Sequence, residues 1–341
     1  MRVPLALVLA IAIPVSGAAA DPPTGVLAAS AGEVVVLAEP SGAWTEIFAT
    51  GEVGWLFPAP GGVLFAPDLV AGRTTVIDLR SREVAERIDG VTMPRFVGDA
   101  SDRYVVTAGD LLVVSYPDRA LLSRVEAELE RPWQAVATPE GRFVLVLERS
   151  PDGSGVEELV AVDVVTREVV SRRALPGDVR AMELIQGLGL LALVGGDSVT
   201  LVSPSTLAPA VLLPVDGHPR DVAILDEGRV AVVTAVEDAG AVVVFRLKPK
   251  KRELKVRQSA WVGLPAPPVR AASSPDGRYV AVGLESAQLV VVDPDREELV
   301  AVHDLPGSPR DVVWCDPARP GPVLPDWSDQ KPRQLEIEPE R

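Results

Sequence analysis

The chain has 341 residues, of which 47% are hydrophobic, and a formal net charge of −15 from 48 Asp and Glu against 33 Lys and Arg. This apolar content is enough for a large core and excludes wholesale disorder, and the acidity argues against nucleic acid as a general partner. The single cysteine excludes an intramolecular disulfide and any cysteine-based zinc site.

The first twenty residues have the features of an export signal. Arg2 gives a positive start, residues 3–15 are apolar, and residues 16–20 supply the small side chains that signal peptidase requires. Cleavage after Ala20 would leave Asp21 as the new N-terminus. A membrane anchor is the alternative, but the apolar stretch is short for a span of about 20 residues. We therefore expect an exported protein, periplasmic or extracellular, that does not span a membrane.

From residue 54 onward, short Val-rich runs separated by turn residues recur with a period of about forty residues. The clearest unit enters at Pro268, turns at Asp276-Gly277, and continues through apolar runs at 279–282, 288–293 and 298–302. These runs are almost continuously apolar, which is typical of strands buried on both faces. The unit restarts near residues 54, 94, 132, 179, 219, 269 and 309. Four strands in about forty residues indicate a propeller blade.

The ends of the chain complete this pattern. Three runs, 26–29, 34–37 and 44–48, precede the first restart, and one run, 310–314, follows the last. The sequence therefore predicts an all-β fold, a seven-bladed β-propeller over 21–315 with four-stranded antiparallel blades. A C-terminal strand would pair with the N-terminal strands and close the ring. Residues 316–341 are Pro-rich and predict a flexible tail, with Trp327 as its one possible anchor.

One repeat motif suggests a family. Prolines at blade entries, Pro275-Asp276-Gly277-Arg278-Tyr279-Val280 and the Val-Val-Asp run ending at Asp293 together resemble the YVTN-type, WD40-like seven-bladed β-propellers of exported proteins. The resemblance covers most of residues 25–315 and implies the fold, because members differ widely in role. The sequence Tyr-Val-Thr-Asn itself is absent, and Tyr279-Val280-Ala281-Val282 comes nearest to it.

Aligning the restarts gives the candidate ligand-binding residues. The position about two places before each innermost apolar run holds five Arg and two Trp: Trp55, Arg95, Trp133, Arg180, Arg220, Arg270 and Arg310. In a propeller this position lies at the channel mouth. Arg binds carboxylates and phosphates through two parallel hydrogen bonds, and Trp offers a stacking face. Two interpretations remain open: a site for an anionic ligand or protein partner, or ion pairs to neighbouring blades, for which Asp221 and Asp311 are available.

Other chemistry-bearing residues are few. His218 lies before a blade entry and is the one weak candidate for a metal ligand, and His303 is expected to be structural. Cys315 is expected to be a buried, inert thiol. The acidic loops show no spacing of a calcium site. The sequence therefore predicts no catalytic residue, no metal and no cofactor.

A basic run, Lys248 to Arg252, separates two apolar runs and predicts an extended hairpin at the outer edge of a blade. Edge strands often carry Lys to prevent edge-to-edge pairing. An anionic partner, such as a lipid surface or a polyanion, is the alternative.

The leading functional hypothesis is an exported, non-enzymatic and monomeric propeller that binds a protein or an anionic small molecule at the channel mouth. One alternative is a redox-associated propeller, haem d1-like or like a dehydrogenase subunit, in which His218 would be the iron ligand. A second alternative is a lactonase-like hydrolase, which the scarcity of His weakens.

Overall fold

The computed structural model describes residues 23–318 except for 60, 69, 90–94, 99–102, 108–110, 116–120, 127, 130–131, 139–141, 150–156, 164, 176–177, 205–207, 227 and 251–252. The predicted signal segment and all of the tail beyond Ala318, including Trp327, lie outside the described residues. Apart from one short 3-10 helix, η1 (Gln186–Leu188), every regular element described is a β-strand. None of the described helices is long and apolar enough to cross a bilayer.

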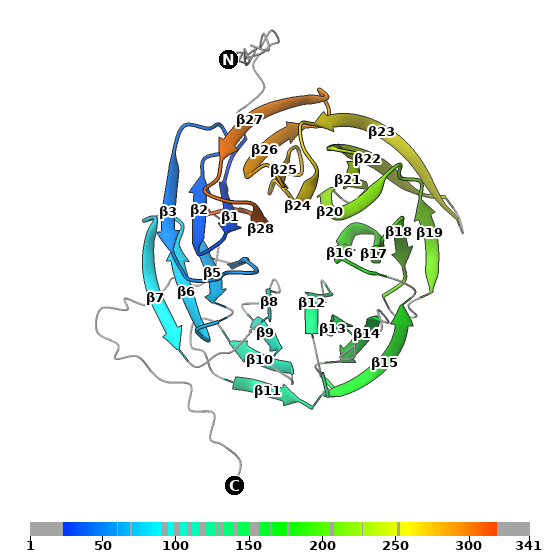
Figure 1. Cartoon of the computed structure of the whole chain (residues 1–341). Helices are drawn as coiled ribbons and strands as arrows, with labels where there is room; N and C mark the ends of the chain where they lie inside the picture. Colours follow the sequence, from blue (N-terminus) through cyan, green and yellow to red (C-terminus); the bar gives the residue numbers. More distant parts are fainter. Residues whose placement is uncertain are drawn as a thin grey trace, which may run out of the picture.

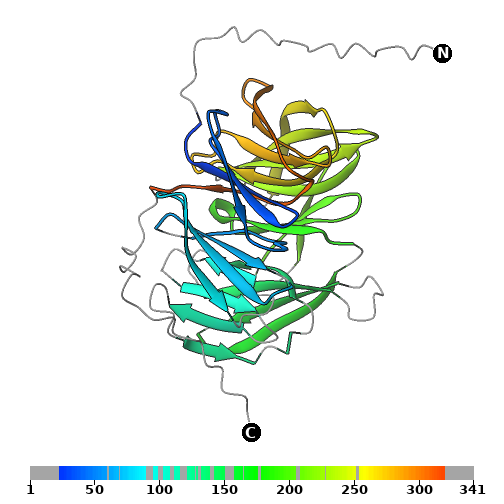
Figure 2. The same cartoon turned by 60° about the vertical axis from the view of Figure 1, so that its left-hand side comes forward.

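Within the described residues, the strands form four-stranded antiparallel sheets arranged around a central axis (Figures 1 and 2). One sheet joins β28 (Pro309–Cys315), β1 (Val26–Ala31), β2 (Val34–Ala38) and β3 (Thr45–Ala49). The next two hold β4 (Phe57–Ala59), β5 (Val63–Asp68), β6 (Arg73–Asp78) and β7 (Glu83–Asp89), then β8 (Arg95–Gly98), β9 (Arg103–Thr107), β10 (Leu111–Ser115) and β11 (Leu121–Val125).

Four further sheets follow in chain order. They hold β12 (Pro132–Ala137), β13 (Phe143–Arg149), β14 (Glu157–Asp163) and β15 (Glu168–Leu175), then β16 (Ala181–Ile185), β17 (Leu190–Val194), β18 (Val199–Val202) and β19 (Pro209–Leu213). The last two hold β20 (His218–Asp226), β21 (Arg229–Val236), β22 (Ala239–Lys250) and β23 (Glu253–Leu264), then β24 (Pro268–Ser273), β25 (Val280–Leu284), β26 (Gln288–Asp293) and β27 (Glu298–Asp304).

The predicted closure is confirmed. β28, the last strand described, pairs with β1 in antiparallel register from Val26 opposite Cys315 to Ala31 opposite Pro309. The chain ends thus share one blade, and the all-β prediction of four-stranded antiparallel blades holds. Pairing of the innermost strand removes the open sheet edge that a linear stack of blades would leave there.

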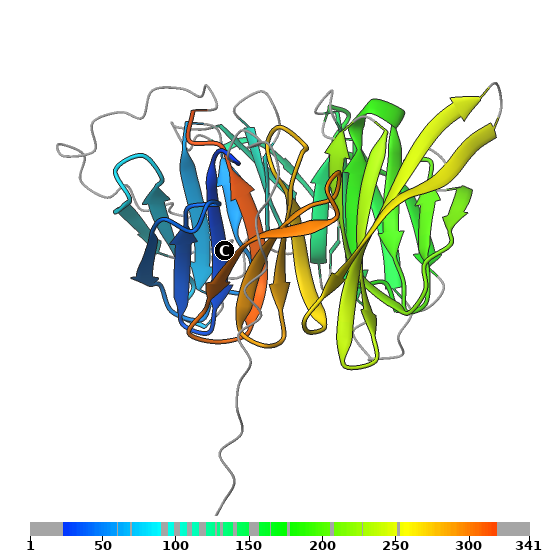
Figure 3. The same ribbon diagram turned by 90° about the horizontal axis from the view of Figure 1, so that it is seen from above.

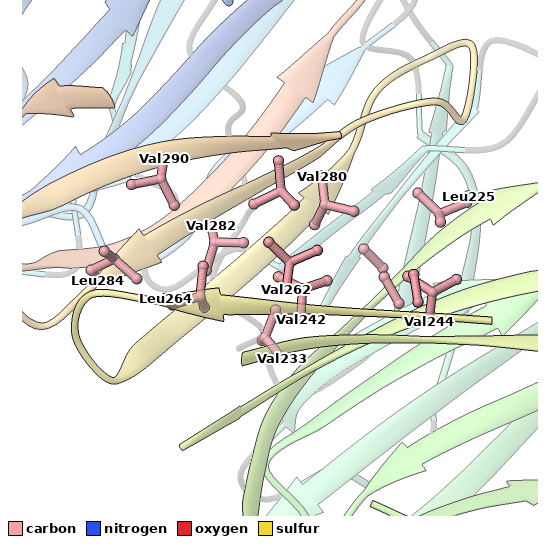
Figure 4. Packing of buried hydrophobic residues seen from close by; sticks show 14 of the residues in the cluster. Leu225, Val233, Val242, Val244, Val262, Leu264, Val280, Val282, Leu284 and Val290 are labelled. Atoms are coloured by element: carbon pink, nitrogen blue, oxygen red, sulfur yellow. The ribbon is translucent and has the colours of Figure 1, made fainter. Parts of the chain in front are cut away.

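Side chains on the two faces of each blade explain the Val-rich runs. Every residue of β25 is buried, as are all but one of β26, whereas the outer strand β27 alternates between exposed and partly buried residues. Figure 4 shows the contact between two blades, where Val242 and Val244 of β22 lie against Val280 and Val282 of β25. Strands buried on both faces need apolar side chains at consecutive positions, which is why period-2 alternation is lost.

The prediction of seven equivalent blades needs correction. Five hydrophobic clusters join six consecutive blades, from the β12–β15 blade round to the β4–β7 blade. The β8–β11 sheet is described as paired backbone, and of the side chains within it only that of Val125 is described. Backbone pairing does not depend on side-chain contacts, whereas blade-on-blade packing does. These five clusters therefore establish six packed blades within the described residues, rather than the seven equivalent blades predicted.

The turn at Asp276-Gly277 fixes the spacing of two blades. Gly277 has a φ of +67°, and a Cβ at this position would collide with the carbonyl of Leu225 in the preceding blade. The hydroxyl of Ser274 accepts hydrogen bonds from the N–H groups of Arg278 (3.1 Å) and Tyr279 (2.9 Å), which closes the turn. Only glycine satisfies both the positive φ and the close approach.

We expect Gly277→Ala to lower the free energy of unfolding by about 1–3 kcal/mol, because it adds backbone strain and a clash across the blade contact. Urea denaturation measures this. Gly307→Ala is the matched control, since a Cβ there would meet nothing within 4 Å. Equal stability of the two variants would contradict this role for the turn.

Candidate functional site at the channel mouth

The strand register divides the candidate Arg and Trp residues into two groups. On β20, a bulge between Pro219 and Asp221 leaves Arg220 without a cross-strand partner. On β24, the bulge lies between Pro268 and Arg270, so Arg270 occupies the position of Asp221 rather than that of Arg220. Sequence alignment missed this shift of one residue because both segments carry an Arg near the entry proline. Nothing in the sequence marks which residue is the bulged one.

The first group forms a rim of guanidinium groups at the start of innermost strands. Arg310 pairs with Glu52 at 2.6 Å, Arg180 donates to Asp178 at 2.8 Å, and Arg220 lies 3.9 Å from Glu285. The acids Glu52 and Glu285 belong to neighbouring blades or their connections. The alternative of ion pairs to neighbouring blades is therefore met at Arg220 and Arg310, with Glu285 and Glu52 as the acids in place of Asp221 and Asp311.

The pairing of Arg220 is the weakest of the three. Its Nε is buried and has no hydrogen-bond partner among the described residues. Its side chain is 35% exposed, so the guanidinium group still reaches solvent. An Arg with an unsatisfied donor beside an exposed face is a site where an added oxyanion gains hydrogen bonds.

The second group lies deeper in the channel. The Arg270 guanidinium group stands 4.8 Å from the centroid of the Trp55 ring, in cation–π geometry, and 4.0 Å from a carboxylate oxygen of Asp221. Its side chain is only 12% exposed. The structure therefore brings together two of the candidate residues, Trp55 and Arg270. The side chains of Arg95 and Trp133 lie outside the described residues.

Hydrogen bonds from one innermost strand to the next surround this channel. Asp221 accepts from the N–H of Ala271 at 2.9 Å, and Asp311 accepts from the N–H of Leu56 at 2.7 Å. Gln134 both donates to the carbonyl of Met182 and accepts from its N–H, each at 2.8 Å. The side chain two residues after an entry proline thus holds the backbone of the following blade. We call these three contacts the channel belt.

Sequence reasoning missed Glu183, which projects from β16 into the same charged environment. Burial, and then the negative charge of Asp221, raise the pKa of Glu183 to about 8, although the N–H of Leu184 lowers it. Burial raises the pKa of Asp311 to about 7, with Arg270 opposing that rise. Burial likewise raises the pKa of Asp221, again against Arg270. One guanidinium group thus offsets the burial of two of these three carboxyl groups and leaves Glu183 without a cation, which favours retention of protons near neutral pH.

We expect the protein to lose stability as the pH rises from 5.5 to 8.5, and Glu183→Gln to lose less. Folding raises the Glu183 pKa from an ordinary value of about 4.3 to about 8. The contribution of the neutral Glu183 carboxyl to the free energy of unfolding is therefore fully present below its ordinary pKa. This contribution is lost as the pH rises to the raised pKa of the folded state. The amide cannot ionise, so the variant avoids that loss. Urea unfolding at several pH values measures the difference.

Glu83→Gln is the control for this experiment, because it removes an exposed carboxyl on β7. This variant should keep the pH dependence of the wild type. The same pH dependence for Glu183→Gln and the wild type would contradict a raised pKa at Glu183.

The remaining candidates lie apart from the channel belt. His218 is exposed, and its Nδ1 lies 3.1 Å from Asp197. Cys315 is buried, as expected, and burial raises the pKa of its thiol to about 12. Burial lowers the pKa of His303. Among the described residues, no group of three or more His, Cys, Asp or Glu is placed to hold a metal ion.

Comparison with known proteins gives the class of fold. No family model matches the chain, and no curated protein matches it in sequence. Solved structures do match. Hydrazine synthase from Kuenenia stuttgartiensis aligns with a TM-score of 0.59 and 16% identity over 76% of this chain and 90% of that one.

Two further structures align over more of this chain. The β-propeller domain of Cps50 (Swd1) from Myceliophteria thermophila has a TM-score of 0.62 and 13% identity, over 80% of this chain and 91% of that one. A putative 6-phosphogluconolactonase from Bacteroides fragilis has a TM-score of 0.63 and 11% identity, over 88% of this chain and 100% of that one. At such identities the likeness shows the β-propeller fold alone. Membership of the YVTN type stays a prediction.

Proposed function

We propose that this propeller is a non-enzymatic binding protein that takes an anionic ligand, or an acidic surface of a protein partner, at the channel mouth. The observation that carries the proposal is the rim of Arg180, Arg220 and Arg310, three guanidinium groups at equivalent points of three blades. Because equivalent positions of propeller blades lie on one face, the three groups converge on the same mouth.

The rim is suited to exchange of partners. Each pair that it makes joins side chains that are 31% exposed or more, so each is screened by water and weak. An incoming carboxylate or phosphate can replace Glu285 at the exposed part of the Arg220 guanidinium group. Below the rim, the Arg270 guanidinium group lies over the Trp55 ring and beside Asp221. A propeller fold supports a scaffold role in general, and we propose that it acts as a monomer without a cofactor.

We expect Arg220→Ala/Arg310→Ala to lower the affinity for citrate, a soluble tricarboxylate probe, by about tenfold or more, because two oxyanion-binding groups are lost. The variant should still fold, since exposed ion pairs contribute only about 0–1 kcal/mol each. Isothermal titration calorimetry on the full chain measures binding, and thermal denaturation checks folding.

Arg87→Ala/Arg167→Ala is the matched control, since both residues are exposed and lie on β7 and in the β14–β15 turn, away from the rim. The control should bind citrate like the wild type. Undiminished binding by the rim variant, or no binding by the wild type, would overturn the proposed anion site.

We further propose that the protein is exported, with its signal cleaved after Ala20. The support is the charge, length and small-residue pattern of residues 1–20. N-terminal sequencing of the protein purified from the cells that naturally export it should give a sequence that begins at Asp21. Sequencing that begins at Met1 would contradict export by this signal.

A further inference from the structure

The β22–β23 hairpin extends beyond its own blade. β21 pairs with β22 only as far as Arg229 opposite Arg246, whereas β22 and β23 stay paired as far as Lys250 opposite Glu253. Figure 3 shows this two-stranded ribbon projecting past the other blades. We call the paired residues 246–250 and 253–257 the basic arm. The predicted extended hairpin is confirmed, and its two faces differ.

One face of the basic arm is apolar. Leu247 is buried, and Leu254 and Val256 pack with it against the cluster that joins this blade to the β16–β19 blade. This anchorage fixes the orientation of the ribbon. The other face must therefore point toward the β24–β27 side, where the neighbouring turn carries Asp295.

The second face carries four exposed cations in facing pairs. Arg246 lies directly opposite Arg257, and Lys248 directly opposite Lys255. Like charges at opposite positions of two strands destabilise the pairing. In the described part of the chain, none of these four side chains forms an ion pair, although acids outnumber bases 48 to 33 in the sequence. Four of the five lysines of the chain lie between residues 248 and 255.

A hollow of about 410 Å³ adjoins this face, lined by Arg246 and Lys248 from the arm and by Arg229 and Asp295 beneath it. Arg229 is already held: it donates to Asp226 at 2.6 Å and to both oxygens of Asp295 at 2.9 and 3.1 Å. The acids of the hollow are thereby engaged by Arg229. Arg246 and Lys248 are left facing the hollow without a carboxylate.

We propose that the basic arm and this hollow bind a small ligand that carries two or more phosphate or sulfate groups. Facing positions across the ribbon lie about 5 Å apart, and alternate positions along a strand lie about 7 Å apart. A ligand with several oxyanion groups therefore contacts cations of both strands at once and relieves their repulsion. A volume of this size suits a small molecule.

Protection of a sheet edge explains lysines on one edge strand, but it does not explain a hollow walled by unpaired cations.

This site is independent of the channel mouth. β20 begins at the rim with Arg220 and ends at Asp226 beside the hollow, so the two sites lie at opposite ends of the same strand.

The test is calorimetric titration of the full chain with inorganic tripolyphosphate at low ionic strength. We expect Arg246→Gln/Lys248→Gln/Lys255→Gln to weaken binding by about tenfold or more, and added salt to weaken binding by the wild type. The thermal stability of this variant should equal or exceed that of the wild type, because like charges have been removed. The control Arg87→Gln/Arg167→Gln should bind tripolyphosphate as the wild type does.

Three outcomes would overturn the proposal. One is unchanged affinity in the arm variant, and another is an equal loss of affinity in the Arg87/Arg167 control. The third is binding to phosphatidylglycerol vesicles through the arm without binding of tripolyphosphate, which would assign the arm to a lipid surface instead.

Discussion

Pairing of β28 with β1 is the constraint on which the rest of the ring depends. It brings the end of the described chain back to its beginning, and the neighbouring contacts reinforce it. The Trp314 indole N–H donates to the carbonyl of Thr24 at 2.9 Å, and the Trp314 ring stacks on Tyr279 of the adjacent blade with centroids 6.4 Å apart. Closure without a disulfide is possible because the β28–β1 pairing and the bond from Trp314 to Thr24 join segments almost three hundred residues apart.

Closure also determines the electrostatics of the channel. Asp311 lies on the closing strand and must reach the N–H of Leu56 in the following blade, so its carboxyl group is buried by necessity. Asp221 is buried for the same reason at Ala271. Arg270 sits between these two blades and offsets part of the burial cost, but a third carboxyl, Glu183, has only the charge of Asp221 as its neighbour. The hydrogen bonds that hold blades together thus bury the carboxyl groups of Asp221 and Asp311, and burial raises the pKa of both.

The sequence predicted strands and closure because both depend on local features. Val-rich runs define the strands, and the repeated Pro-x-x-Val entries define their order. The grouping of Arg270 with Asp221 rather than Arg220 could not be predicted, because a bulge moves a residue by one position without changing composition. Glu183 also gave no signal, since its raised pKa arises first from burial and then from a carboxylate in the next blade. Arg95 and Trp133 remain predictions, because their side chains lie outside the described residues.

The two kinds of cation are used differently in this acidic protein. Arg is spread over the blades, where its planar group holds carboxylates in fixed geometry, as Arg229 holds Asp295. Lys is confined almost wholly to the basic arm, where a mobile point charge contacts solvent. A cation with a purely structural role would be stabilised by an ion pair with one of the many acids. Four cations that face one another instead remain available to a ligand, and the excess of acids that gives the whole chain its net charge of −15 repels that ligand from other surfaces. The acidity of the protein thereby sharpens the selectivity of the arm for its anion.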